Sequence, residues 1–166
     1  MRDNDTYYQS PNSNHISDLI APTESQFSFT DETAISAEQQ TSQKTTPAQS
    51  FNEAIIKLLV LLYQIDGKVT LTEQDYFDEV TASLEWRSGV SISAFINDAI
   101  HQARVAIDEQ SSREFLFTLG DSLNLNAAQA LEYAMDITAV DGNRSDDELE
   151  LLSLLSNRVL ARGLVV

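Results

Sequence analysis

The sequence contains no cysteine, which excludes a catalytic thiol, a thiolate zinc site and a disulfide framework. It has only five glycines, and they form neither a P-loop, nor a dinucleotide-binding fingerprint, nor a nucleophile elbow. The lack of thiols fits a reducing compartment. These absences exclude several common enzyme classes before any motif is considered.

Basic side chains are also few: ten Lys and Arg stand against 26 Asp and Glu, which gives a formal charge of −16 at pH 7. Such a surface repels phosphate backbones and anionic lipid headgroups, so we expect neither nucleic-acid binding nor peripheral membrane binding. The charge suggests one further function, an acidic decoy that mimics DNA. However, a charge run is usually a solvated face, and the acidity is spread over the whole chain.

Long apolar runs are absent as well. The longest apolar stretch, residues 54–63, is interrupted by Lys57 and is far shorter than the roughly 20 residues of a membrane span. The first ten residues, MRDNDTYYQS, lack the basic and then apolar pattern of a signal peptide. We therefore expect a soluble, cytoplasmic protein with no direct membrane insertion.

The chain changes character near residue 50. Residues 1–49 are rich in Ser, Thr, Asn, Gln and Asp and lack helical or strand periodicity, so we predict a disordered polar N-terminal arm. Its only stretch apolar enough to dock is residues 15–29, HISDLIAPTESQFSF. A solubilising tail is the main interpretation of the arm, and a docking motif is the alternative. Residues 50–166 are predicted to form a helical domain.

Capping boxes mark the helix starts in this domain. In each box, a cap residue precedes a Glu or Gln by three positions, and each side chain binds the other residue's backbone N–H. Since period-two alternation is absent, we predict an all-α fold, a compact bundle of about six or seven helices. The boxes are Ser50 with Glu53, Thr70 with Glu73, Ser111 with Glu114, Asn126 with Gln129 and Ser145 with Glu148, and a sixth helix is predicted from Ser91 to Asp108.

The predicted helices differ in how much of their surface is apolar. The first has apolar residues in nearly every direction and should be central. The helix from Ala127 to Val140 is rich in alanine, which allows a neighbour to approach closely. The C-terminal helix has an apolar stripe too wide for one contact. It is either buried on two sides or faces a partner, for which a homodimer through this helix is one candidate.

The segments LLYQIDGKVTLTE (61–73) and ITAVDGNRSDDE (137–148) share Asp-Gly followed by Glu six residues after the glycine. A shift of 75 residues aligns these segments together with their flanking apolar positions. We interpret them as a duplicated helix-turn-helix unit, which predicts two pseudo-symmetric halves that share one core. The aligned pairs are Asp66 with Asp141, Gly67 with Gly142, Thr70 with Ser145 and Glu73 with Glu148.

These repeated turns have two interpretations. In the structural one, left-handed glycines end a helix, the boxes start the next, and the aspartates accept backbone N–H groups in Asx-turns. In the other, the aspartates hold a ligand, because negative charge is unfavourable at a helix C-terminus. The all-oxygen set of Asp66, Glu73, Asp141 and Glu148 would select a divalent cation such as Ca²⁺, Mg²⁺ or Mn²⁺.

The calcium-binding EF-hand loop also contains Asp-Gly followed by Glu six residues after the glycine. The second half of that loop fits DGKVTLTE in the first copy, including the apolar Val69 two residues after the glycine, but the first two ligand positions fail in both copies. Leu62 and Gln64 occupy those positions in the first copy, and Ile137 and Ala139 occupy them in the second. Failure at the same positions in both copies argues for another family.

The segments LLYQIDGKVTLTEQDYFDEV (61–80) and AMDITAVDGNRSDDELELLSLLSNRVL (134–160) resemble TerB-like domains. This all-helical family includes tellurite-resistance proteins and is similar to the N-terminal region of the DjlA co-chaperone. The likeness covers most of residues 50–160. It implies two related halves, a metal site at the four acidic turn residues, and a stress-response role through membrane-associated protein partners. The sequence departs from the family at Ile65, Val140 and Arg144.

The leading functional prediction is therefore a non-enzymatic interaction module that binds protein partners and is modulated by a divalent cation. The alternative is a metal-dependent hydrolase in which the carboxylates hold an ion that activates water. A dedicated base is not evident. His15 lies in the predicted arm, and His101 lies within a predicted helix beside Asp98 and Arg104, where a surface histidine is the default interpretation.

Overall fold

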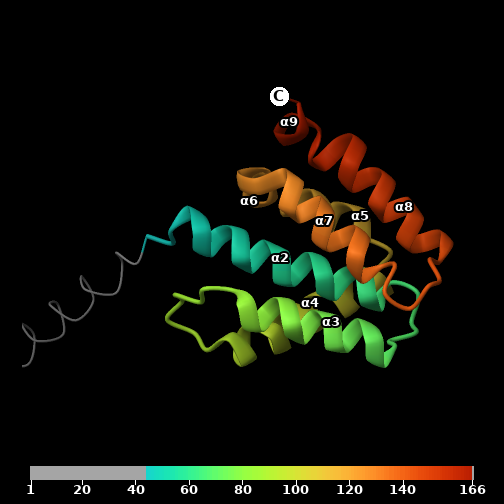
Figure 1. Ribbon diagram of the computed structural model, residues 1–166, viewed down its shortest axis with the longest axis horizontal. Coiled ribbons are helices and arrows are strands. Elements are labelled where there is room, and N and C mark those ends of the chain that lie inside the picture. Colours follow the sequence, from blue (N-terminus) through green and yellow to red (C-terminus); the bar gives the residue numbers. More distant parts are fainter. Residues whose placement is uncertain (1–43, 166) are drawn as a thin grey trace, which may run out of the picture. The chain divides into compact units, whose positions relative to one another are not determined.

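The computed structural model describes residues 44–165, and all regular structure in this range is helical, as predicted (Figure 1). The predicted disordered arm lies almost wholly outside the described residues. The elements in chain order are α2 (Pro47–Gln64), α3 (Leu71–Ser83), α4 (Ile92–Asp108), α5 (Ser112–Thr118), α6 (Gly120–Leu123), the 3₁₀ helix η3 (Asn124–Asn126), α7 (Ala127–Ile137), α8 (Asp146–Leu154), the π-helix η4 (Leu155–Val159) and α9 (Ala161–Leu164).

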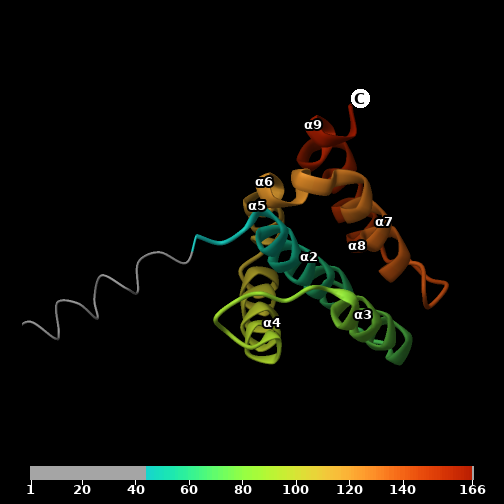
Figure 2. The same ribbon diagram turned by 60° about the vertical axis from the view of Figure 1, so that its left-hand side comes forward.

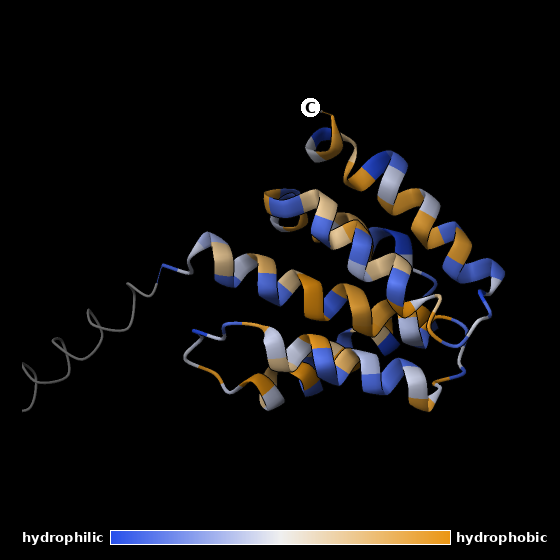
Figure 3. Ribbon diagram, in the orientation of Figure 1, coloured by the Kyte–Doolittle hydropathy of each residue, from blue (hydrophilic) through white to orange (hydrophobic). Residues whose placement is uncertain are grey.

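Helix α2 is the central element, which confirms the prediction from its apolar pattern. It packs against α3, α4, α6 and α7 (Figures 1 and 2). Hydrophobic residues dominate the middle of this helix (Figure 3), and 13 of its 18 residues are buried. Since burial of one Leu or Ile side chain contributes about 1.5–3 kcal/mol, α2 supplies much of the stability of the fold.

Helix α2 begins four residues earlier than the predicted cap at Ser50 implies, because its N-cap is Thr46. The Thr46 hydroxyl accepts the Gln49 N–H at 3.2 Å, and Pro47 occupies the first helical position, where its missing N–H costs nothing. The predicted box of Ser50 with Glu53 is therefore wrong. An upstream Thr-Pro pair provides the start, and Ser50 lies inside the helix.

The other predicted helix starts have mixed outcomes. Complete boxes begin α3 and α8, at Thr70 and Ser145, and Ser91 caps α4, as predicted. The box at Ser111 is wrong, because its hydroxyl donates to the Ala106 carbonyl oxygen instead. Asn126 Oδ1 accepts the Gln129 N–H at 3.4 Å. The Gln129 side-chain oxygen, however, accepts from the side-chain amide of Asn126, so that box is half-formed.

Helix α7 ends at Ile137 rather than at Val140. The Thr138 hydroxyl donates to the Ala134 carbonyl oxygen at 3.0 Å. The Arg144 guanidinium donates to Thr138 Oγ1 at 3.1 Å and to the Met135 carbonyl oxygen at 2.9 Å. These bonds satisfy the C-terminal carbonyl groups of α7 without a further turn of helix. They also give Arg144, which departs from the TerB-like pattern, a structural role.

The predicted C-terminal helix is three elements, α8, η4 and α9. The Leu160 N–H donates to the Leu155 carbonyl oxygen at 2.8 Å, a five-residue spacing that defines the π-helix between α8 and α9. Most of the wide apolar stripe lies in the core of the same chain, whereas Leu149 is 48% exposed. The buried members of the stripe are Leu151, Leu152, Leu155, Val159 and Leu160.

Candidate functional site

The first Asp-Gly turn joins α2 to α3 and is held by local hydrogen bonds. Gly67 has φ = +72°, in the left-handed region that favours glycine. Asp66 Oδ1 accepts the Lys68 N–H at 2.9 Å, which is an Asx-turn. Glu73 Oε2 accepts the Thr70 N–H at 2.7 Å, and Thr70 Oγ1 accepts the Glu73 N–H at 3.3 Å.

The second turn, between α7 and α8, repeats this geometry. Gly142 has φ = +80°, and Asp141 Oδ1 accepts the Asn143 N–H at 2.9 Å. Glu148 Oε2 accepts the Ser145 N–H at 2.6 Å, and Ser145 Oγ accepts the Glu148 N–H at 3.2 Å. Both copies therefore have the left-handed glycine, the Asx-turn and the capping box that the structural interpretation predicts.

The fold brings the two turns to the same end of the bundle (Figure 1). Glu73 and Glu148 are each only 3% exposed. Burial raises the pKa of the Glu148 carboxyl, hydrogen bonds from Ser145 lower it, and the nearby carboxylates of Asp66 and Glu73 raise it. Three of the four predicted ligands thus interact electrostatically, whereas Asp141 is exposed.

The donor chemistry at this end of the bundle fits a hard divalent cation, because every candidate ligand atom is a carboxylate oxygen. The geometry is less complete. One oxygen of each glutamate is engaged in a capping box, and one oxygen of each aspartate is engaged in an Asx-turn. Within residues 44–165, no group of three or more His, Cys, Asp or Glu side chains is arranged to hold a metal ion.

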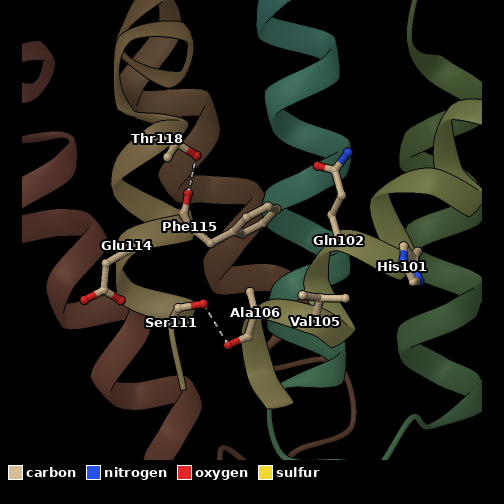
Figure 4. A pocket seen from close by; sticks show the side chains of 8 residues that line it. All are labelled: His101, Gln102, Val105, Ala106, Ser111, Glu114, Phe115 and Thr118. Carbon is tan, nitrogen blue, oxygen red and sulfur yellow. Dashed lines mark hydrogen bonds between the residues drawn. The ribbon is translucent and has the colours of Figure 1, made fainter. Parts of the chain in front are cut away.

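A second feature, which the sequence analysis missed, is a groove of about 450 Å³ between α4 and α5 (Figure 4). Its surface is mainly apolar, with Val105 39% exposed and the Phe115 ring half-buried. Phe115 also packs against the hydrophobic core, so the floor of the groove is anchored. The lining residues are His101, Gln102, Val105, Ala106, Ser111, Glu114, Phe115 and Thr118. We call this feature the α4–α5 groove.

The groove contains Ser, His and Glu side chains, but they are not paired as a nucleophile and its base. The Ser111 hydroxyl donates to the Ala106 carbonyl oxygen at 3.3 Å. His101 and Glu114 lie on opposite sides of the groove (Figure 4). His101 is exposed, which confirms its interpretation as a surface histidine.

One signal in the sequence could have indicated the groove. Ala99, Ala103 and Ala106 form the buried stripe of α4, and Val105 lies outside it. Single aliphatic residues are common on protein surfaces, so Val105 gives only a weak indication of apolar surface on α4. What lies opposite Val105 depends on where α5 packs, which this signal does not reveal.

No protein-family model, curated protein or solved structure matches the chain. The likeness to TerB-like domains therefore stays a prediction that rests on the two turn segments. Within the part of the chain that the structure describes, no helix has the length and apolar character to cross a membrane.

Proposed function

We propose that this chain is a non-enzymatic interaction module that binds an apolar side chain of a protein partner in the α4–α5 groove. The observation that carries the proposal is the groove itself, about 450 Å³ with a mainly apolar surface. This volume falls within the roughly 300–1,000 Å³ range of ligand-binding pockets.

The shape of the groove suits an anchor side chain. Interfaces gain most of their affinity from a few buried aromatic or aliphatic anchors in well-packed pockets. Phe115 supplies a ring that the core holds in place, and Val105 supplies an aliphatic wall from the opposite helix. A Leu, Met or Phe side chain of a partner would cover both surfaces and remove them from water.

Site-specific photo-crosslinking in cells of the native host tests this function. A photo-crosslinking amino acid replaces either Val105 or Val140, which have the same exposed fraction of 39% but lie on α4 and on the second turn. We expect a discrete crosslinked protein from position 105, with the crosslink mapped to an apolar segment of that protein. The absence of a crosslink at 105, or equal products from both positions, would contradict the proposal.

A second candidate function is divalent cation binding at the paired turns. The observation that favours it is the placement of both acidic turns at one end of the bundle, where the carboxylates of Asp66 and Glu73 help to raise the pKa of the buried Glu148 carboxyl. A cation would relieve this repulsion and raise the stability of the folded protein, since a ligand bound only by the native state stabilises it. Such an ion could modulate partner binding by stiffening the turn end of the bundle.

Thermal unfolding tests the cation directly. The full chain is compared in EDTA and in Ca²⁺, Mg²⁺ or Mn²⁺, beside the double variant Asp66→Asn, Asp141→Asn. Asparagine preserves side-chain size and the Asx-turn while it removes the charge. We expect one ion to raise the Tm of the parent only. Equal shifts in the parent and the variant would exclude the turns as the site.

The resemblance to TerB-like domains motivates a proposal about cellular context, a role in the response to tellurite or a related stress. Tolerance of tellurite by the native host, with and without the gene, tests that role. Complementation with a Val105→Ser variant then shows whether the α4–α5 groove is required for it.

A further inference from the structure

We propose that the partner segment in the α4–α5 groove is basic, an apolar anchor residue flanked by Lys or Arg. This inference rests on the function proposed above and specifies the chemistry of its partner. It depends on the charges around the groove and on a comparison of the occupants that this groove could accept.

The rim of the groove is acidic. Its eight lining residues include one carboxylate, Glu114, which is exposed, and no Lys or Arg. Asp98, one turn before the lining residue Gln102 on α4, accepts the Gln102 side-chain amide at 2.5 Å. A neighbouring hollow shares Thr118 with the groove and is lined by one carboxylate, Glu53, and one ammonium group, Lys57. The one carboxylate in the lining, Glu114, and the one that contacts Gln102, Asp98, are therefore the charges that a ligand in the groove meets on α5 and α4.

The cationic side chains of the adjoining surfaces are engaged elsewhere. Arg113 forms an ion pair with Glu150 on α8. Lys57 places its ammonium group 5.6 Å from the centre of the Phe95 ring, in a cation–π contact. Arg104 donates from Nε to the side chain of Gln64 at the end of α2. Arg113 is thus paired with an opposite charge, whereas Lys57 and Arg104 contact neutral groups and keep their positive charge. None of the three lines the groove, and the net charge of −16 keeps the protein as a whole strongly acidic.

The possible occupants of the groove differ in the sign of their charge. A second copy of this chain carries the same charge of −16 and is repelled. Residues 15–29, the most apolar part of the N-terminal region, include Asp18 and Glu24 and no Lys or Arg, so their charge has the same sign as the rim. A basic partner is the occupant whose charge complements the rim, and such complementarity favours both encounter rate and specificity.

Fluorescence polarisation with the full chain tests the inference. Three synthetic peptides are compared: one with a central Leu between lysines, a second with each lysine replaced by Glu, and a third with the Leu replaced by Ser. We expect the Lys–Leu peptide alone to bind, with affinity that falls as salt is raised. Binding of the acidic peptide, or equal binding of the Leu and Ser peptides, would overturn the inference.

Variants locate the binding. Val105→Ser should weaken binding of the Lys–Leu peptide about tenfold, because it removes one aliphatic contact. Glu114→Gln should weaken it about threefold, since exposed charge pairs contribute little. Val140→Ser is the matched control, because Val140 is exposed to the same 39% but lies on the second turn. Equal losses at 105 and 140 would show that binding is not in the groove.

The outcomes separate this inference from the function it rests on. If position 105 crosslinks to a partner through an acidic or neutral segment, the interaction module stands and the basic class is wrong. If neither crosslinking nor peptide binding involves position 105, both proposals fail. A dimer of the full chain that Val105→Ser dissociates in sedimentation would identify a second copy as the occupant and overturn the basic partner.

Discussion

The Tyr76 hydroxyl on α3 donates a hydrogen bond to Asp136 Oδ2 on α7, 3.3 Å away. This bond links the second helix of the first helix-turn-helix unit to the first helix of the second unit, 60 residues apart in the chain. Burial raises the pKa of the Tyr76 hydroxyl, and the Asp136 carboxylate raises it further. The protonated phenol is therefore part of the contact between the two units.

Tyr76→Phe should lower the free energy of unfolding by about 0.5–1.5 kcal/mol at pH 7, because it removes this hydrogen bond. A tyrosine whose folded-state pKa is raised contributes stability that is present below its unfolded pKa of about 10 and is lost as pH rises above it. The parent should therefore lose more stability than Tyr76→Phe between neutral and strongly alkaline pH. Urea unfolding across that range measures both effects. Parallel pH profiles for the two proteins would contradict this role of the hydroxyl.

Glu148→Gln tests the contact between the two acidic turns. Glutamine also completes a capping box, so the helix start is preserved. Because the pKa of the Glu148 carboxyl is raised, its ionisation opposes folding as pH rises from the unfolded value of about 4.3. Relative to the variant, the parent should lose stability between acidic and neutral pH. Glu132→Gln, at an exposed position on α7, is the control for the removal of one surface carboxylate.

Gly67→Ala and Gly142→Ala should destabilise the protein by similar amounts, about 1–2 kcal/mol each. A Cβ atom at either glycine would meet nothing within 4 Å, so the expected cost is backbone strain at positive φ and not a clash. Asparagine tolerates this conformation better, and Gly→Asn at each position should therefore cost less. Denaturant midpoints compare the four variants. A markedly unequal cost at the two glycines would show that the turns differ in the unfolded or folded state.

Gly163→Ala should destabilise the C-terminus by a different mechanism. A Cβ atom there would lie 2.6 Å from Ala127 Cβ and 2.7 Å from Asn124 Oδ1, because α9 packs closely on η3 and the start of α7. Asn124 also accepts the Gly163 N–H at 2.9 Å. Such overpacking costs about 1–3 kcal/mol. Hydrogen exchange should show loss of protection in α9 first. Unchanged protection and stability would mean that α9 shifts without cost.

The features that followed from the sequence are those set by local hydrogen bonds. The Asp-Gly turns and the boxes at Thr70 and Ser145 involve partners at most three residues apart, so residue type and spacing are enough to predict them. The box at Ser50 was wrong because a stronger start, Thr46 with Pro47, lies just upstream. The box at Ser111 was wrong because the Ser111 hydroxyl donates to the carbonyl oxygen of Ala106, five residues earlier.

Other features depended on where helices distant in sequence pack. The spacing of the two turns indicated equivalent positions, but only the packing of α2 against α7 brings Asp66 and Glu73 near Glu148. The α4–α5 groove likewise exists because α5 leaves the Val105 wall of α4 uncovered. The sequence by itself thus determined the helical class, the two turns and the acidic charge. Tertiary structure decided which carboxylates meet and which apolar surface stays open, because both depend on contacts between side chains that the chain separates.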